Sequence, residues 1–186
     1  ERKQRDLREL VRLIRDEVKD VVMVILYGSY ARNTYVECDE RHDFGVKTFY
    51  ISDYDLLVVT KRRLGEREST INTRIKDRFL SGKDAEFHTR PQIINESISK
   101  LNNAISECRY FYVDILEQGV MLYNSGEYQL ATPRDLNYSE IKEMAQRYFD
   151  NKFGTAEDFL IAAEHCMKKD GIKDVPFNFI RLLKII

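Results

Sequence analysis

The chain has 186 residues, of which 43% are hydrophobic and 33% charged, which is the composition of a globular protein with one large domain or two small ones. A formal net charge of −1 gives no overall positive field, so any contact with nucleic acid would need a local patch. The longest apolar run is far too short to span a bilayer, so we expect no membrane partner. Three cysteines without a paired spacing, and no visible signal peptide, favour a cytoplasmic setting. The chain begins with Glu1 rather than Met, which suggests a fragment.

The first two predicted elements are a helix and a strand. Apolar residues recur every three or four positions over residues 7–18, with charged residues between them, which predicts an amphipathic helix. Val21–Tyr27 is nearly all β-branched or aliphatic, which predicts a strand buried on both faces. Gly28-Ser29 ends this strand abruptly.

Strands and helices are expected to alternate in the middle of the chain. Residues 33–50 are polar and predict an exposed insertion, with a short hairpin as one form of it. Tyr54–Thr60 predicts a second apolar strand, and the spacing from Ile71 to Phe79 predicts a helix. Residues 85–89 are a short strand candidate, closed by Pro91.

The remaining pattern is mainly helical. The apolar stripe from Ile94 to Ile105 predicts a helix, and residues 110–118 predict a helix that packs its aromatic side chains. A short strand is expected at Val120–Tyr123. After about residue 130 only helical patterns occur, including an apolar face from Ala156 to Met167 and a helix-compatible stretch at 177–186.

A strand that runs into a glycine turn is one way to bind a phosphate chain. Backbone N–H groups of such a turn point into a small concavity, and the start of a following helix adds partial positive charge. Gly28 would let a phosphate approach the backbone, and Ser29 adds a hydroxyl donor. An ordinary turn explains the same two residues.

Two carboxylates open the second predicted strand. Asp53 and Asp55 are two residues apart, so a strand places them on one side. Crowded carboxylates repel each other unless a cation lies between them, and Mg²⁺ prefers such oxygen ligands and shares them with substrate phosphates. The alternative is a solvated entrance to the strand with ordinary turn aspartates.

The combination of Gly28-Ser29 after one strand and Asp-x-Asp at the next resembles the nucleotidyltransferases of the polymerase β type, above all the minimal nucleotidyltransferases. The resemblance implies an α+β fold in which residues 1–130 form a polymerase β-like domain, with a mixed sheet and flanking helices. It also implies that Gly28 and Ser29 hold nucleotide phosphates and that Asp53 and Asp55 bind Mg²⁺ or Mn²⁺.

Two features refine this resemblance. Ala31-Arg32 extends the motif, and Asn33 stands where the family often has glycine. Arg32 would reach a phosphate, although an ordinary surface position explains it equally well. Asp53 follows Ser29 by 24 positions, a long gap for small members of the family, so residues 33–50 are interpreted as an insertion.

The family usually adds a third carboxylate from a later strand, as a general base or metal ligand. Glu86 is the first choice for that catalytic role, and Asp84 has the same strand parity. Asp114 is a third option, although it falls in a predicted helix. Some relatives keep the fold and lose catalysis at this position.

The tail is similar to the first helix of a HEPN domain, a helical domain that often follows or pairs with a minimal nucleotidyltransferase. Residues 131–186 are therefore interpreted as an all-α, HEPN-like and incomplete segment. Many HEPN domains are ribonucleases with an Arg-x4–6-His motif, but none occurs after residue 147. Packing alone would explain the same apolar stripe.

The resemblance implies a transferase that moves a nucleoside monophosphate from an NTP, with ATP as the first choice, to a hydroxyl of a protein, an RNA or a small molecule. A protein acceptor would fit a toxin–antitoxin pair in which a HEPN partner is modified. The alternative is a nucleotide-binding or antitoxin-like regulatory module that acts on a HEPN partner with little turnover. A nucleic-acid partner and a homo-oligomer both stay open.

Overall fold

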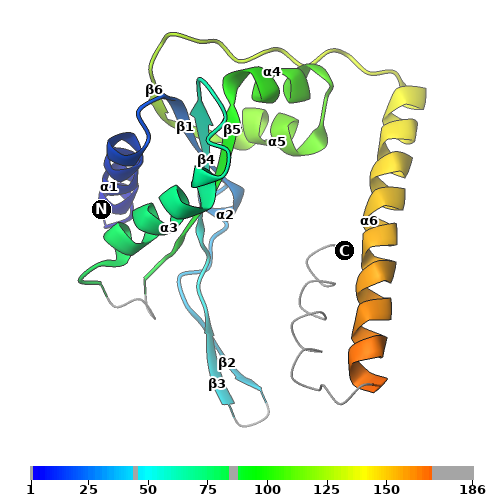
Figure 1. The fold of residues 1–186 in the computed structure, drawn as a ribbon, viewed down its shortest axis with the longest axis horizontal. Coiled ribbons are helices and arrows are strands. Elements are labelled where there is room, and N and C mark those ends of the chain that lie inside the picture. The colour runs from blue at the N-terminus through cyan, green and yellow to red at the C-terminus, as the bar shows by residue number, and fades with distance from the viewer. Residues whose placement is uncertain (1, 44–45, 84–87, 169–186) are drawn as a thin grey trace. The chain divides into compact units, whose positions relative to one another are not determined.

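The computed structural model describes residues 2–43, 46–83 and 88–168 (Figure 1). Contacts divide the chain into two compact units, Glu1–Arg134 and Asp135–Ile186. Within the described ranges, no helix is both long and apolar enough to cross a membrane. The elements in chain order are α1 (Arg2–Glu17), β1 (Val21–Tyr27), α2 (Gly28–Ala31), β2 (Asp39–Asp43), β3 (Val46–Tyr50), β4 (Tyr54–Thr60), α3 (Arg67–Leu80), β5 (Pro91–Ser97), α4 (Ile98–Ser106), α5 (Tyr110–Gln118), β6 (Val120–Asn124) and α6 (Tyr138–Lys168).

The first unit is built on a four-stranded sheet with the strand order β5-β4-β1-β6. β1 pairs antiparallel with both β4 and β6, whereas β4 and β5 are parallel. The sheet is therefore mixed, and helices flank it, which confirms the predicted α+β class.

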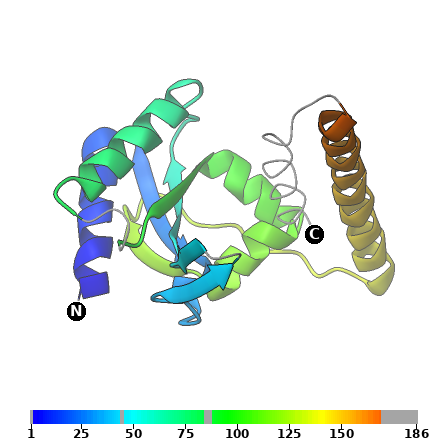
Figure 2. The ribbon, with the colours of Figure 1, turned by 90° about the horizontal axis from the view of Figure 1, so that it is seen from below.

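Helices cover both faces of this sheet. α1 and α3 lie on one face, and α4 and α5 lie on the other (Figures 1 and 2). The strand predicted at Val21–Tyr27 is confirmed, and so is its burial on both faces: Leu26 packs under α1 and α3, and Ile25 packs under α4 and α5, each 4% exposed. The site therefore stands on a strand that two apolar cores hold in place.

The strand candidate at residues 85–89 is wrong where the structure describes it. Residues 88 and 89 are not in a strand, and 85–87 lie outside the described residues. The strand instead begins at Pro91. β5 is at the edge of the sheet, and a proline at the first position of an edge strand gives up little ladder hydrogen bonding, so proline opens this strand rather than closing one.

The helix predicted from Ile94 begins later, because Ile94 belongs to β5. α4 begins at Ile98, where the Oγ of Ser97 accepts a hydrogen bond from the backbone N–H of Lys100 at 3.4 Å. A serine cap of this kind marks the start of a helix more sharply than apolar spacing does. The helices and strands predicted within 7–18, 54–60, 71–79, 110–118 and 120–123 are confirmed.

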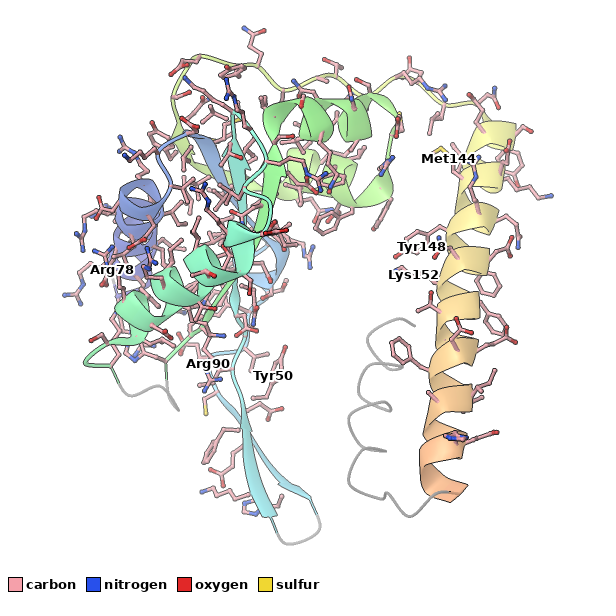
Figure 3. All side chains as sticks on the ribbon, viewed as in Figure 1. Tyr50, Arg78, Arg90, Met144, Tyr148 and Lys152 are labelled. Atoms are coloured by element: carbon pink, nitrogen blue, oxygen red, sulfur yellow. The ribbon has the colours of Figure 1, made fainter. Side chains whose placement is uncertain are left out.

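The polar insertion forms a two-stranded antiparallel hairpin of β2 and β3. It extends away from the sheet, with Tyr50 near the base of the hairpin (Figures 1 and 3). Two strands alone are marginally stable in water, and the hairpin hydrogen-bonds to no other strand of the described chain. Ser52 anchors its base, because the Ser52 Oγ accepts from the N–H of Val36 at 2.9 Å and the N–H of Ser52 donates to the carbonyl of Val36 at 3.0 Å.

The described part of the second unit is one helix, α6, of 31 residues. Met144, Tyr148 and Lys152 follow one another at one-turn spacing along one side of it (Figure 3). The Lys152 ammonium lies 5.6 Å from the centroid of the Tyr148 ring, a cation–π contact within the helix. The predicted apolar face from Ala156 falls in this helix up to Lys168, and the stretch at 177–186 lies outside the described residues.

Candidate active site at the end of the central strands

The turn after β1 is packed directly against β4. Gly28 has a φ of +72°, in the left-handed region where a side chain is strained. A Cβ added to Gly28 would lie 2.3 Å from the Oδ2 of Asp55, far inside van der Waals contact. The position therefore needs glycine twice, once for its backbone angle and once because a carboxylate lies against it.

The helix after this turn is shorter than a phosphate-binding helix would be. α2 spans only Gly28–Ala31, a single turn, so it adds little of the macrodipole that a longer helix would supply. Any binding of phosphate here would depend on the N–H groups of the turn and on the hydroxyl of Ser29, which is partly exposed.

Asp55 occupies the middle of a row of side chains that crosses three strands. Tyr27 on β1 is opposite Asp55, and Gln92 on β5 is opposite Asp55 from the other side. Residues opposite one another on neighbouring strands share a face of the sheet. The next row inward belongs to the core beneath α4 and α5, and it consists of Ile25, Leu57 and Ile94.

Asp53 and Asp55 lie close enough to influence each other. Asp53 precedes β4 by one residue, so the alternation of the chain sends both carboxylates to the same side. Burial and, to a smaller extent, the negative charge of Asp53 raise the pKa of Asp55 to about 6, and the nearby guanidinium of Arg32 acts against both. A divalent cation shared by the two carboxylates would remove their repulsion, so the pair fits a hard metal ion.

Gln92 lies beside the aspartates and was not among the predicted site residues. Its Nε2 donates to the Oδ2 of Asp53 at 3.3 Å. Sequence spacing could not reveal this contact, because only the parallel pairing of β4 with β5 places position 92 opposite Asp55. The neighbour that the next strand supplies is therefore a neutral amide and not a carboxylate.

The predicted third acid falls in a part of the chain that the structure does not describe. Glu86 and Asp84 both lie outside the described residues. In the described part of the chain, no group of three His, Cys, Asp or Glu side chains could hold a metal ion. Asp114, the third option, lies on α5, where it pairs with Arg32.

Arg32 lies at the border of the site. Its Nη1 is 3.7 Å from the Oδ2 of Asp114, and both side chains are partly exposed. Its positive charge partly offsets the rise in the pKa of Asp55, so Arg32 lies within electrostatic range of the carboxylate pair. Arg32, the predicted phosphate contact, therefore lies near the carboxylate pair. Its partner in the structure is Asp114 of α5.

Aromatic side chains border the site on the β1 side. The Tyr27 and Phe111 rings meet edge to face, with centroids 5.6 Å apart. Burial, the charge of Asp55 and the neighbouring Tyr112 together raise the pKa of Tyr27 well above its usual range. The prediction that α5 packs its aromatics is confirmed for Tyr112, which packs against the core that contains buried Ile115. It is wrong for Tyr110, which is 78% exposed, and Phe111 is 41% exposed.

The opposite face of the same strand end is closed. Tyr54 is completely buried, and its hydroxyl donates to the Oδ2 of Asp6 at 3.2 Å. Its ring lies 4.5 Å from the ring of Tyr30, which is stacked at 4.3 Å on Tyr35. Since Tyr30 belongs to α2, these contacts hold the turn that contains Gly28 against β4.

A polar groove opens on the β5 side of the site. It has a volume of about 610 Å³ and runs between the first turns of α3 and the start of β5. Among its lining residues are Asn72, Thr73 and Gln92. Gln92, which also donates to Asp53, is a lining residue that this groove shares with the surroundings of the carboxylate pair.

Comparisons with known proteins give only weak likenesses. No family model matches the chain, and no curated protein matches it. Among solved structures, the chain is similar to a rebuilt structure of a tri-AMPylated HEPN toxin from Shewanella oneidensis in complex with MNT antitoxin, at 13% identity, a TM-score of 0.38, and coverage of 84% of this chain and 98% of the other. A toxin–antitoxin crystal structure with AMP-PNP matches at 14% identity over 83% and 98% of the two chains, with the same TM-score.

A third likeness is to a mutant of the toxin–antitoxin pair MntA–HpeT, at 12% identity, a TM-score of 0.38 and coverage of 83% and 98%. Likenesses at these scores argue for no fold or function. The chemistry of this chain must therefore be inferred from its own residues.

Proposed function

We propose that this chain is a metal-dependent nucleotidyltransferase that transfers a nucleoside monophosphate from an NTP, with ATP as the first choice, to a hydroxyl acceptor. One observation carries the proposal: the Asp55 carboxylate lies against Gly28, so the phosphate turn and the acidic pair form one site. A metal-bound triphosphate needs both features within the length of a phosphate chain.

Each proposed residue has a distinct part in the transfer. Gly28 and Ser29 bind the phosphates, Arg32 adds a positive charge beside them, and Asp53 with Asp55 hold Mg²⁺ or Mn²⁺. A bound divalent cation would neutralise charge on the phosphates as the reaction proceeds. These assignments are supported by the pairing of Tyr27 with Asp55, by the close approach of Gly28 to Asp55, and by the charges of Asp53 and Arg32 near Asp55.

The proposed reaction forms one bond and breaks one. The acceptor oxygen bonds to the α-phosphorus, the bond from that phosphorus to the bridging oxygen breaks, and pyrophosphate leaves with the electron pair. The hydroxyl proton passes to a carboxylate base, for which Glu86 is the first choice and Asp84 the second. An acceptor in the polar groove would meet the site at Gln92, which lines the groove and donates to Asp53.

Residues 1–130 would form the nucleotidyltransferase domain, and 131–186 a HEPN-like helical segment. The division into compact units at Arg134 and Asp135, together with the long helix α6, supports this arrangement. In this proposal the acceptor or partner is a protein, such as a HEPN domain, and the setting is cytoplasmic.

A second function is favoured by one specific observation. Gln92, a neutral amide, has the position beside Asp53 that a third acid on the neighbouring strand would take. If Glu86 does not reach the pair, the chain would bind a metal–nucleotide complex and act as a regulatory module with little turnover.

The test uses the full chain with α-labelled ATP and Mg²⁺. We expect label transfer and pyrophosphate release by the wild type, and loss of both in Asp53→Asn/Asp55→Asn. The matched control is Asp20→Asn/Asp77→Asn, which removes the same charge at two exposed positions and should behave as the wild type. Equal signals from the wild type and the site variant would refute the assignment, and ATP binding without pyrophosphate release would establish the regulatory alternative.

A further inference from the structure

We infer that Phe111 is the stacking platform for the nucleobase of the nucleoside triphosphate. The inference rests on the proposed function and goes beyond it, because it assigns the base to an aromatic side chain at a position where the sequence pattern suggested only core packing. It depends on where α5 lies, on how Phe111 is oriented, and on how much of its surface is open.

α5 reaches the phosphate turn at two points. Phe111 meets Tyr27, the residue before Gly28, and Asp114 pairs with Arg32, the residue after α2. Residues three apart lie on the same face of a helix, so Phe111 and Asp114 present one surface to the turn. The turn is therefore bracketed by two contacts with the same helix.

The position of Phe111 is fixed from beneath. Ile115, one helical turn later, is 3% exposed and packs in the same core as Ile25 of β1. A platform that is held by its own helix loses little freedom when a ligand stacks on it, which favours affinity.

The ring of Phe111 has aromatic neighbours but is not covered by them. Its contacts with Tyr27 and Tyr112 are both edge to face, with interplanar angles of 87° and 74°. Phe111 is still 41% exposed. Covering an exposed phenylalanine ring with a flat apolar surface is favourable, because it removes the ring from water. Every nucleobase offers such a surface.

The geometry favours the nucleobase over the acceptor as the group that stacks on Phe111. The base is tethered through the ribose to phosphates at Gly28 and Ser29, and Phe111 contacts the residue directly before that turn. The polar groove lined by Gln92 lies on the β5 side and is left for the acceptor, whereas Phe111 lies on the β1 side. The two ligands are thus assigned to opposite sides of the carboxylates.

The experiment compares ATP with inorganic tripolyphosphate, which has the phosphates and lacks the base. Binding of each to the full chain is measured by calorimetry in Mg²⁺. Phe111→Leu keeps an apolar side chain and removes the aromatic face, so we expect ATP to bind about tenfold more weakly, as for the loss of a single base–aromatic stack. Tripolyphosphate should bind the variant and the wild type equally, and Phe111→Tyr should restore the affinity for ATP.

Phe153→Leu is the matched control, since Phe153 is an exposed phenylalanine, 53% accessible, on α6 of the other unit. It should leave both affinities unchanged. Unchanged ATP binding by Phe111→Leu would overturn the stacking role, and so would an equal loss for ATP and tripolyphosphate, which would mean that the turn itself had moved. If the wild type binds neither compound, the proposed function fails and not only the role of Phe111.

Discussion

The two faces of β4 end differently at the same edge of the sheet. On the face under α1 and α3, Tyr54 is completely buried and its hydroxyl is hydrogen-bonded to Asp6. On the face under α4 and α5, the next residue, Asp55, stays partly exposed beside Asp53. Two consecutive residues at one end of β4 thus differ: Tyr54 closes one face of the sheet, and Asp55 gives the other face an open acidic group.

The closed face of β4 supports the open one. Crowded carboxylates destabilise a fold, because each is partly desolvated and repels the other. Tyr54 opposes this locally, since its buried ring contacts Tyr30, and Tyr30 belongs to the turn that begins at Gly28. The turn is therefore held from the face that has no part in the proposed chemistry.

The largest effect is expected on the closed face. Tyr54→Ala removes a fully buried ring, so the free energy of unfolding should fall by about 3–5 kcal/mol. Tyr54→Phe keeps the ring and removes only the donor to Asp6, which should cost about 1 kcal/mol. Urea denaturation followed by circular dichroism measures both. A loss below that of Tyr54→Phe in the alanine variant would contradict the view that this ring seals the face.

An intermediate effect is expected at the turn between the two faces. Gly28→Ala should lower the free energy of unfolding by about 2–4 kcal/mol, because a side chain at a φ of +72° is strained and its Cβ would overlap Asp55. Gly126→Ala is the matched control: Gly126 has a φ of +79° but nothing within 4 Å of the added Cβ, so it should cost only about 1–2 kcal/mol. Thermal and urea unfolding measure both variants. If Gly28→Ala and Gly126→Ala lose the same free energy of unfolding, Asp55 does not lie against the turn.

The smallest effect is expected on the open face, and its sign is reversed. The pKa of Asp55 is raised in the folded chain from 3.8 to about 6, so the folded state holds a proton that the unfolded state releases. Stability from this group is complete below pH 4 and is lost as the pH rises through about 6. Asp55→Asn should therefore stabilise the chain by about 1–2 kcal/mol at pH 7.5 with a chelator present, and should have little effect at pH 4.

The same charge change at an exposed helical position, Asp77→Asn, serves as the control for this experiment and should alter stability little at either pH. Urea unfolding at pH 4 and at pH 7.5 measures the difference. If Asp55→Asn destabilises the chain at pH 7.5, the carboxylate is a structural group and the contrast between the faces is lost.

The sequence by itself determined the local features of this protein. The apolar run from Val21 predicts a strand buried on both faces, and alternation along a strand places Asp53 and Asp55 on one side. Glycine at position 28 marks a turn because few other residues accept its backbone angle. Each of these conclusions depends on neighbours within a few positions, where the spacing of the chain decides the geometry.

Only the tertiary structure decided which distant residues meet these features. Strand register brings Gln92 to Asp53, and the packing of Ile115 brings Phe111 to Tyr27, although neither pair is close in sequence. Such contacts follow from how sheets pair and how helices pack on them, and many registers satisfy the same alternation of apolar and polar residues. The acidic pair could therefore be predicted, whereas its amide neighbour and its aromatic border could not.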